Sequence, residues 1–258
     1  MGRNFLPVSR IRYPILSSQT QRSKMAHPLK DYYQDIYRNY DLVNRIFTFG
    51  QDHSWRKKAV MECLADNPEW IIDICTGTGD LILEIARNTD RKLELTGYDF
   101  TAEMLQVAMK KAARMKVDIE FIEGDVAQMP FTDNRFDAAG ITFGIRNLLY
   151  ENANASAHLA EIGRVLKPGG RLVILESSKP GNRIWRVING FYLRFILPYL
   201  GGFISGNMEA YRYLARSSKN YYTIPEMKSI LESSGFHVIK YNSLFLGSVM
   251  LMVAENQK

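Results

Sequence analysis

The sequence predicts an α/β fold: a seven-stranded, mostly parallel sheet with helices on both faces. Short apolar runs alternate with helical patterns from residue 70 onward, an order typical of parallel sheets. The last two runs, 237–244 and 248–255, are joined by too few residues for a parallel crossover, so we expect an antiparallel hairpin at one edge. The chain has 258 residues, which suits one such domain with an extension.

The elements are expected in a regular order along the chain. Apolar runs predict strands at 70–75, 93–99, 119–125, 136–143 and 171–177, ahead of the two closing strands. Helical periodicity predicts helices at 79–89, 102–115, 154–166 and 224–235. The third helix stops before the Pro168-Gly169-Gly170 turn, and the fourth has Pro225 in its first turn and Gly235 beyond its end.

Two segments fall outside this alternation. Residues 30–62 predict an N-terminal helical segment, and residues 178–223 lie between a strand and its helix, where about two to six residues would suffice. An insertion at the carboxyl end of a strand lies over the binding crevice of such sheets, so we expect 178–223 to form a cap. We therefore expect one domain over 30–258, preceded by a basic tail over 1–29.

Much of the positive charge lies in the tail. The whole chain has a formal charge of +6, of which residues 1–24 carry +5, and residues 25–258 sum to only +1. No basic stripe is evident in the body, which argues against nucleic acid as a partner. Three interpretations of the tail stay open: a targeting segment, a tether to an anionic surface, or an over-extended start before Met25, which we favour.

Cysteine use and hydropathy indicate a protein of a reducing compartment. Cys63 and Cys75 are the only cysteines, with no Cys-x-x-Cys or His/Cys cluster, so we expect no metal. No window of 18 uncharged apolar residues exists; the nearest, 187–206, is broken by Arg194 and Pro198. A cytoplasmic location follows as the expectation.

The segment DICTGTGD (73–80) joins the first strand to the first helix. Gly77 and Gly79 permit a tight turn and close approach of the backbone to a ligand, and the following helix offers free N–H groups. A dinucleotide site would have a third glycine where this chain has Ile82. The loop therefore predicts a cofactor site of another kind.

Acidic residues close the first three strands. Asp73 and Asp80 flank the glycine turn and favour a cofactor with cationic groups, such as the ammonium and sulfonium of S-adenosylmethionine. Asp99 ends the second strand, where a carboxylate accepts ribose hydroxyls. Asp125 ends the third and can reach the exocyclic amine of adenine, with Val126 beside the ring; a helix N-cap is the alternative for Asp125.

The stretch TFGIRN (142–147) places charge at the end of a core strand. Arg146 and Asn147 follow the apolar run RFDAAGI and Gly144. A guanidinium is rarely placed there without a partner. We expect the pair to face a ligand; the alternatives are an ion pair with a carboxylate of the cap for Arg146 and a helix N-cap for Asn147.

Four separated motifs resemble the ubiquinone/menaquinone biosynthesis C-methyltransferases. In chain order they are YDLVNRIFTFGQDHSW (40–55), FGIRN (143–147), RVLKPGGRLVILESS (164–178) and AYRYLARS (210–217). The resemblance runs from about residue 30 to the C-terminus. The chain departs from the family pattern at Val43 (usually Met), at Thr48 (usually Ser) and at His53, which lies two rather than three residues before Trp55.

The resemblance implies a class I S-adenosylmethionine-dependent methyltransferase fold and C-methylation of a polyprenylated quinol, with demethylmenaquinol favoured over a benzoquinol. It implies cofactor contacts from Asp73, Gly77, Thr78, Gly79, Asp99, Phe100, Asp125, Val126 and Thr142. It implies catalytic roles for Arg146, Asn147 and Tyr40, and substrate contacts from Asp41, Phe143, Phe191, Phe195 and Tyr211.

The chemistry of this reaction gives Arg146 and Asn147 their expected roles. A ring carbon becomes nucleophilic when a neighbouring hydroxyl loses its proton, which requires alignment, a charge partner for the phenolate and a path for the proton. Arg146 stays charged, so we expect it to lower the pKa of the phenol and orient a water. Asn147 would hold that water or the second ring oxygen.

The apolar segment 187–206 suggests where this reaction takes place. It is expected to line a channel for an isoprenoid tail or to contact a bilayer surface; a cap helix packed on the core is the plainer alternative. We expect a peripheral enzyme at the inner face of the membrane, organellar if the tail is a targeting segment, and a homodimer. Competing functions are an NAD-type oxidoreductase, a methyltransferase for another hydrophobic small molecule, and a non-catalytic adenosylmethionine-binding subunit of a quinone-synthesis complex.

Overall fold

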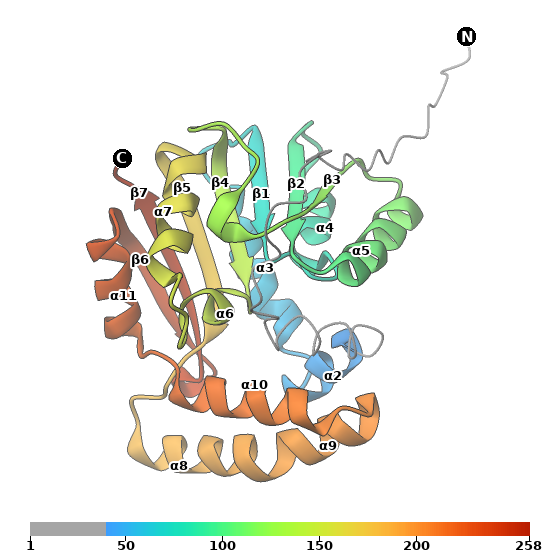
Figure 1. The fold of residues 1–258 in the computed structure, drawn as a ribbon. Coiled ribbons are helices and arrows are strands. Elements are labelled where there is room, and N and C mark those ends of the chain that lie inside the picture. Colours follow the sequence, from blue (N-terminus) through green and yellow to red (C-terminus); the bar gives the residue numbers. More distant parts are fainter. Residues whose placement is uncertain (1–39) are drawn as a thin grey trace.

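A seven-stranded sheet forms the centre of the protein (Figure 1). A computed structural model describes residues 40–258, apart from the side chains of Tyr40 and Ser205. The strand order is β3-β2-β1-β4-β5-β7-β6, with β7 antiparallel to both its neighbours and the other pairs parallel. The strands are β1 Trp70–Ile74, β2 Glu94–Asp99, β3 Glu120–Glu123, β4 Phe136–Thr142, β5 Leu166–Ser177, β6 Phe236–Leu244 and β7 Val249–Asn256. The predicted fold class, including the terminal hairpin, is confirmed.

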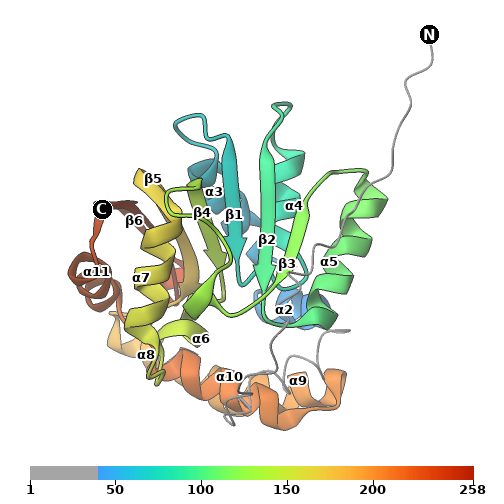
Figure 2. The same cartoon turned by 45° about the horizontal axis from the view of Figure 1, so that its top comes forward.

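Alternating side chains give the sheet two buried faces, each with its own core. In β1, Ile71 belongs to one apolar core and Ile72 to the other. One face is covered by α3 (Asp52–Cys63), α4 (Asp80–Arg87) and α5 (Ala102–Met115), as Figure 2 shows. The other is covered by α6 (Ile145–Leu149), α7 (Ala155–Val165) and α11 (Ile224–Ser233).

The larger differences from the sequence expectation concern β5, β3 and a short helix. β5 begins at Leu166, which pairs with Phe136, and the pairing resumes at Arg171 after an irregularity in the Pro-Gly-Gly turn. β3 ends at Glu123, because Asp125 instead caps the short 3-10 turn η1 (Val126–Gln128). Helix α6 was not predicted, since five residues are too few to display a helical period.

The insertion 178–223 is helical and lies at the carboxyl ends of the parallel strands, and we call it the cap. It contains α8 (Arg183–Phe191), a π-helical turn η2 (Tyr192–Ile196), α9 (Leu197–Ser205) and α10 (Met208–Asn220). In Figure 1 these helices lie below the sheet, with α10 between the sheet and the α8–α9 helix. The indole of Trp185 donates to Ser248 Oγ (2.8 Å) and so ties α8 to the β6–β7 connection.

Helix α2 (Tyr40–Phe47) packs into the cap rather than onto the sheet. Val43 and Phe47 share a separate apolar core with Leu193, Leu197 and Tyr211, among others. The hydroxyl of Tyr192 also donates to the carbonyl of Phe47 (3.0 Å). The N-terminal helix and the cap therefore form one packed unit at the carboxyl ends of the strands, although they are about 145 residues apart in the chain.

Candidate functional site

The carboxyl ends of β1 and β4 lie side by side at the point where the strand order reverses. β1 pairs with β2 on one side and β4 on the other, so consecutive connections run in opposite directions from here. In open α/β sheets this switch point is where ligands bind. The two ends touch: a Cβ added to Gly144 would lie 2.5 Å from Cys75 Cβ. The close approach of Cys75 therefore leaves no room for a side chain at position 144.

Each of these two strand ends is followed by a residue with a strained backbone. Cys75 (φ +57°) and Phe143 (φ +56°) both adopt the left-handed region, which L-residues rarely occupy. Such conformations cost of the order of 1 kcal/mol or more each and cluster at ligand sites. Both follow directly after a strand at the switch point, so the strain marks the same crevice as the topology.

The glycine loop presents its backbone to this crevice. The hydroxyl of Thr76 donates to Asp73 (2.6 Å), and the N–H of Gly79 donates to the carbonyl of Thr76 (2.8 Å), which closes the turn. Gly77 has φ +54°, and among the described residues a Cβ placed on it would meet nothing within 4 Å. The backbone at Gly77 is thus open to close approach by a ligand, as the sequence predicts.

The acidic strand ends are arranged differently from one another. Asp99 accepts from the N–H groups of Gly77 (2.9 Å) and Thr101 (2.8 Å), so it ties the glycine loop to the end of β2. The Asp125 side chain is largely exposed and accepts from Ala127 N–H (2.9 Å), which is the N-cap alternative. The ribose and adenine contacts of these two carboxylates stay predictions.

Asp73 and Asp99 are buried carboxylates in one site. Burial raises the pKa of Asp73 to about 7, against the opposing hydrogen bond from Thr76. Burial likewise raises the pKa of Asp99, against hydrogen bonds from the backbone of Gly77 and Thr101. Within the described part of the chain, Asp73 Oδ1 has no hydrogen-bond partner. A cationic ligand would offset the free-energy cost of burying these carboxylates in their charged form. The site therefore fits a cofactor with positively charged groups.

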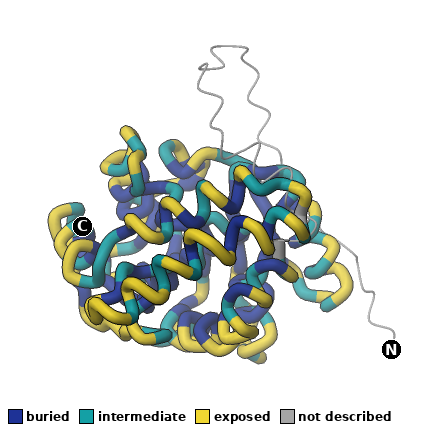
Figure 3. Tube along the Cα trace, turned by 90° about the horizontal axis from the view of Figure 1, so that it is seen from below, coloured by how far each residue is buried: buried dark blue, intermediate teal, exposed yellow. Residues whose placement is uncertain are grey.

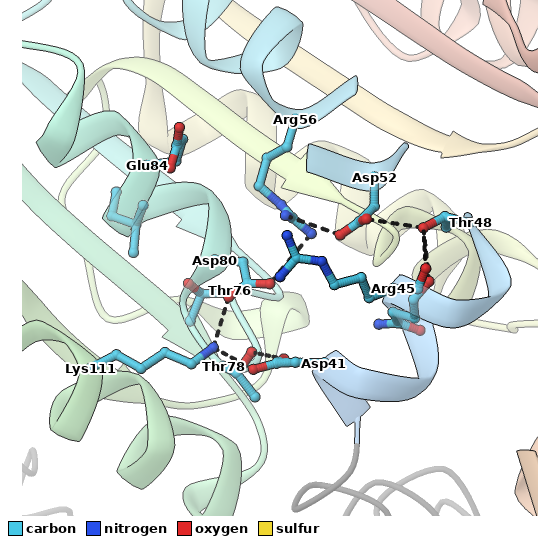
Figure 4. Close-up of polar contacts among 12 residues, drawn as sticks. Asp41, Arg45, Thr48, Asp52, Arg56, Thr76, Thr78, Asp80, Glu84 and Lys111 are labelled. Atoms are coloured by element: carbon cyan, nitrogen blue, oxygen red, sulfur yellow. Dashed lines mark hydrogen bonds and ion pairs between the residues drawn. The ribbon is translucent and has the colours of Figure 1, made fainter. Parts of the chain in front are cut away.

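Helix α2 is fastened to the glycine loop by charged side chains (Figure 4). The hydroxyl of Thr78 donates to Asp41 Oδ1 (2.6 Å). The ammonium of Lys111, on α5, bridges Asp41 Oδ2 (2.6 Å) and Asp80 Oδ1 (2.7 Å). Asp41, predicted to contact substrate, therefore lies against the cofactor loop, and Lys111 holds it there.

The polar contacts continue from Asp80 back to the turn after α2. Arg56 on α3 lies 3.4 Å from both Asp80 and Asp52, and Thr48 donates to Asp52 (3.0 Å). We call the chain of Thr48, Asp52, Arg56, Asp80, Lys111, Asp41 and Thr78 the α2 clasp. Sequence reasoning missed Lys111 and Arg56, because a single basic residue on a helix carries no signal of the partners it will meet.

Arg146 is buried and paired, at only 2% exposure. Its Nη1 donates to Glu176 Oε1 (3.2 Å), Ser177 Oγ (2.9 Å) and Ser218 Oγ (2.8 Å), and its N–H donates to Glu176 Oε2 (3.2 Å). The ion-pair alternative is thus present, but with a carboxylate of β5 in place of one from the cap. The cap contributes Ser218 on α10.

The neighbours of Arg146 line the same strand ends. Asn147 lies inside α6, where Gly144 occupies the N-cap position, so the N-cap alternative for Asn147 is wrong. Its carbonyl accepts from Asn152 (3.0 Å). Thr142 and Phe143 are half-buried where β4 ends, and their contacts with a cofactor or quinol stay predictions.

The other predicted site residues divide between core and surface. Val126 and Tyr211 are buried, Phe100 is half-buried, and Phe191 and Phe195 are exposed on the cap with ring centroids 4.9 Å apart. A Cβ on Gly201 would lie 2.6 Å from the ring of Tyr211, so that ring packs inside the cap. Tyr40 begins α2, but its side chain lies outside the described residues, and His53 is exposed on α3.

A family profile and several named relatives match most of this chain. The profile of the ubiE/COQ5 methyltransferase family matches residues 19–255. A demethylmenaquinone methyltransferase of Thermus thermophilus is 39% identical over 224 residues, covering 86% of this chain and 99% of that protein. Another, of Thermotoga maritima, is 40% identical and covers 85% and 92%. A ubiquinone/menaquinone biosynthesis C-methyltransferase of Geobacter sulfurreducens is 36% identical and covers 88% of each.

Solved structures support the fold. A putative methyltransferase of Bacillus halodurans superposes with a TM-score of 0.57 at 19% identity, covering 79% of this chain and 99% of that one. A SAM-dependent methyltransferase of Aquifex aeolicus gives a TM-score of 0.52 at 19% identity, covering 72% and 81%.

The α2 clasp generates a testable prediction about α2. Replacing Lys111 by methionine leaves Asp41 and Asp80 close together without their shared cation, so α2 should open more often. The ion pairs of Lys111 are partly exposed and so contribute only modestly to the stability of α2. We therefore expect roughly 3- to 10-fold faster hydrogen exchange for the amides of 41–47. The neighbouring exposed Lys110→Met is the matched control and should leave exchange unchanged. Equal rates in both variants would show that the clasp does not hold α2.

Proposed function

This chain belongs to the ubiE/COQ5 methyltransferase family, and on that premise we propose that it transfers the methyl group of S-adenosylmethionine to a ring carbon of a polyprenylated quinol. The observation that carries the proposal is the extent of the match, which includes the glycine loop, the strand ends and the cap. A match confined to the cofactor half would support only a methyltransferase of unknown substrate.

The cofactor end of the crevice fits S-adenosylmethionine. The open backbone at Gly77 permits close approach, and the buried carboxylates of Asp73 and Asp99 suit a cationic molecule. Bound there, S-adenosylmethionine would supply the methyl group on a positively charged sulfur, and this charge itself favours a phenolate nearby. Asp99 and Asp125 are proposed to hold its ribose and adenine, with Val126, Thr142 and Phe100 alongside.

The acceptor end of the crevice is proposed to lie between α6 and the cap. Asn147 is the half-buried polar side chain on α6 at this point, so we assign it the ring oxygen or the water that accepts the phenol proton. Orientation of the ring by such donors accounts for much of the rate that an enzyme provides in reactions of this type.

Arg146 is proposed as a positioning residue rather than as the charge partner of the phenolate. Its guanidinium is already neutralised by Glu176 and held by hydroxyls of Ser177 and Ser218. It therefore fixes α6, and with it Asn147, relative to β5 and to α10 of the cap. This revises the role expected from the sequence, in which Arg146 faced the quinol directly.

The ring is proposed to be the naphthoquinol of demethylmenaquinol, because two of the relatives described above bear that name alone. The Geobacter sulfurreducens relative is named for both quinones, so a benzoquinol is the second candidate. A polyprenylated quinol resides in a membrane, which supports the proposal of a peripheral enzyme at the inner membrane face. The expected homodimer also remains a proposal.

Turnover of a short-chain quinol tests the function. We expect purified enzyme and S-adenosylmethionine to convert demethylmenaquinol into a product one methyl heavier by mass spectrometry, and a benzoquinol more slowly. Gly77→Ala should abolish this by blocking cofactor approach. Gly169→Ala is matched to it, since Gly169 also has positive φ (+71°) and open space around it, and should retain activity. Cofactor binding without turnover of either quinol would favour the non-catalytic subunit. Turnover of another acceptor would instead favour a methyltransferase that acts on a different small molecule.

The raised pKa of Asp73 predicts how cofactor affinity depends on pH. Below about pH 7 free Asp73 holds a proton, which a cationic ligand must displace, so affinity should fall as pH falls. Between pH 7 and 6 we expect a loss of up to about tenfold per pH unit, in calorimetric titrations with S-adenosylmethionine. The amino group of the ligand stays protonated in this window. Asp73→Asn should bind more weakly but with a flat profile; a flat wild-type profile would exclude Asp73 from recognition of the cation.

A further inference from the structure

The outer face of the α8–α9 helix carries a continuous apolar stripe. Its exposed members recur every three or four residues, which places them on one side of the helix. They are Ile184, Val187, Ile188, Phe191, Phe195, Tyr199 and Phe203, and we call them the cap stripe. Ile184 and Val187 are each 74% exposed and Phe203 is 88% exposed. Figure 3, viewed from the side of the cap, shows exposed positions recurring along the helices of this face.

The π turn η2 helps to keep the stripe in line. From Phe191 onward the members are four residues apart, a spacing that drifts around a regular α-helix by about 40° per step. A π turn is wider than an α-helical one and takes up part of this drift. Beside the stripe, in the turn after α2, the exposed ring of Phe49 lies 6.4 Å from that of Tyr192, the residue after Phe191.

The cap is also the basic part of the folded chain. Residues 178–220 contain seven basic residues and one acid, a net charge of +6. Since residues 25–258 sum to +1, the rest of that range carries −5. The near-neutral total of the body therefore conceals an uneven distribution of charge between the cap and the rest. Arg183 and Arg194 are exposed on the same helix as the stripe, and Arg194 lies 5.3 Å from the ring of Phe195.

The helix lies along a surface rather than across a membrane. Arg183–Ile204 is long and apolar enough to span a bilayer, with mean hydropathy 1.3. Its inner face, however, packs in the cap core through Leu193, Leu197 and the contact of Gly201 with Tyr211. Crossing a bilayer would break this core and bury the charge of Arg194 in hydrocarbon, which is unfavourable.

We propose that the cap stripe and the basic residues around it dock this enzyme on an anionic lipid bilayer. An apolar face flanked by Arg and Lys is the chemistry of interfacial helices, in which rings enter the acyl boundary and cations meet lipid headgroups. A second copy of the chain fits less well, because face-to-face contact would bring two strongly positive caps together. The inference rests on the proposed function only in that a membrane-resident quinol gives the docking a purpose.

Docking by this face places the reaction close to the lipid. The stripe lies beside the turn after α2, and the α2 clasp connects the start of that helix to the glycine loop through Asp41 and Thr78. The proposed acceptor end of the crevice lies under α10, on the inner side of the same cap. A quinol ring leaving the bilayer therefore has only the thickness of the cap to cross.

Vesicle sedimentation of the full chain tests the proposal. With vesicles of phosphatidylcholine and phosphatidylglycerol, we expect at least about tenfold tighter binding than with phosphatidylcholine alone. The variant Ile184→Ser/Val187→Ser/Phe203→Ser should lose about tenfold or more of this binding. Met61→Ser removes a comparably exposed apolar side chain from α3 and should bind as wild type. Binding unchanged in the triple variant would overturn the proposal.

Two further experiments distinguish the cap stripe from the N-terminal tail and from a subunit interface. A full chain with glutamine at the five basic positions of residues 1–24 should still bind; loss of binding there, with the triple variant unaffected, would assign it to the tail. Light scattering should give the same oligomeric state for wild type and triple variant; a dimer that dissociates in the variant would make the stripe a subunit interface.

Turnover of a soluble short-chain quinol separates this inference from the proposed function. The triple variant should methylate it at the wild-type rate. Wild-type enzyme that methylates the quinol but does not sediment with vesicles would refute the docking surface alone. Enzyme that sediments as expected but methylates no quinol would refute the function and leave the surface standing.

Discussion

A buried guanidinium must be neutralised where it lies, and the crevice is built around that requirement at Arg146. Glu176 supplies the charge, from the end of β5, and accepts from both the side chain and the backbone N–H of Arg146. Ser218 brings α10 to the same group. Removing one partner of such a pair costs about 3–5 kcal/mol, because the other charge stays buried. The pair therefore determines the position of α6 and of the cap together.

A second set of charges joins the cap to the cofactor loop. Helix α2 packs in the cap core through Val43 and Phe47, yet its first turn meets Thr78 and Lys111. One short helix therefore contacts both the cap and the glycine loop. If the cap docks on lipid as we propose, lipid contact, substrate entry and cofactor retention would meet at this helix.

The fold was predictable from the sequence, because it depends on local patterns. The same patterns point to the strand ends where we place the candidate site. Alternating strands and helices specify the parallel sheet, and acidic strand ends after a GTG turn specify the crevice. The partners were not predictable. Glu176 is 30 residues from Arg146 and looks like part of a core strand, while Asp41 meets Lys111 across 70 residues. Tyr211 looked like a substrate contact because its motif resembles the family, but the ring fills the cap core.

If Arg146 and Glu176 act as one unit that positions Asn147 and the cap, a double-mutant cycle on kcat will show it. Arg146→Met, Glu176→Met and the double variant would be compared with wild type on a short-chain quinol, with folding checked by thermal melting. We expect each single variant to lose activity to a similar extent and the double variant to lose no more than either. A Glu176 variant that keeps its rate, beside an Arg146 variant about 10²–10³-fold slower, would instead place the guanidinium on the reacting quinol.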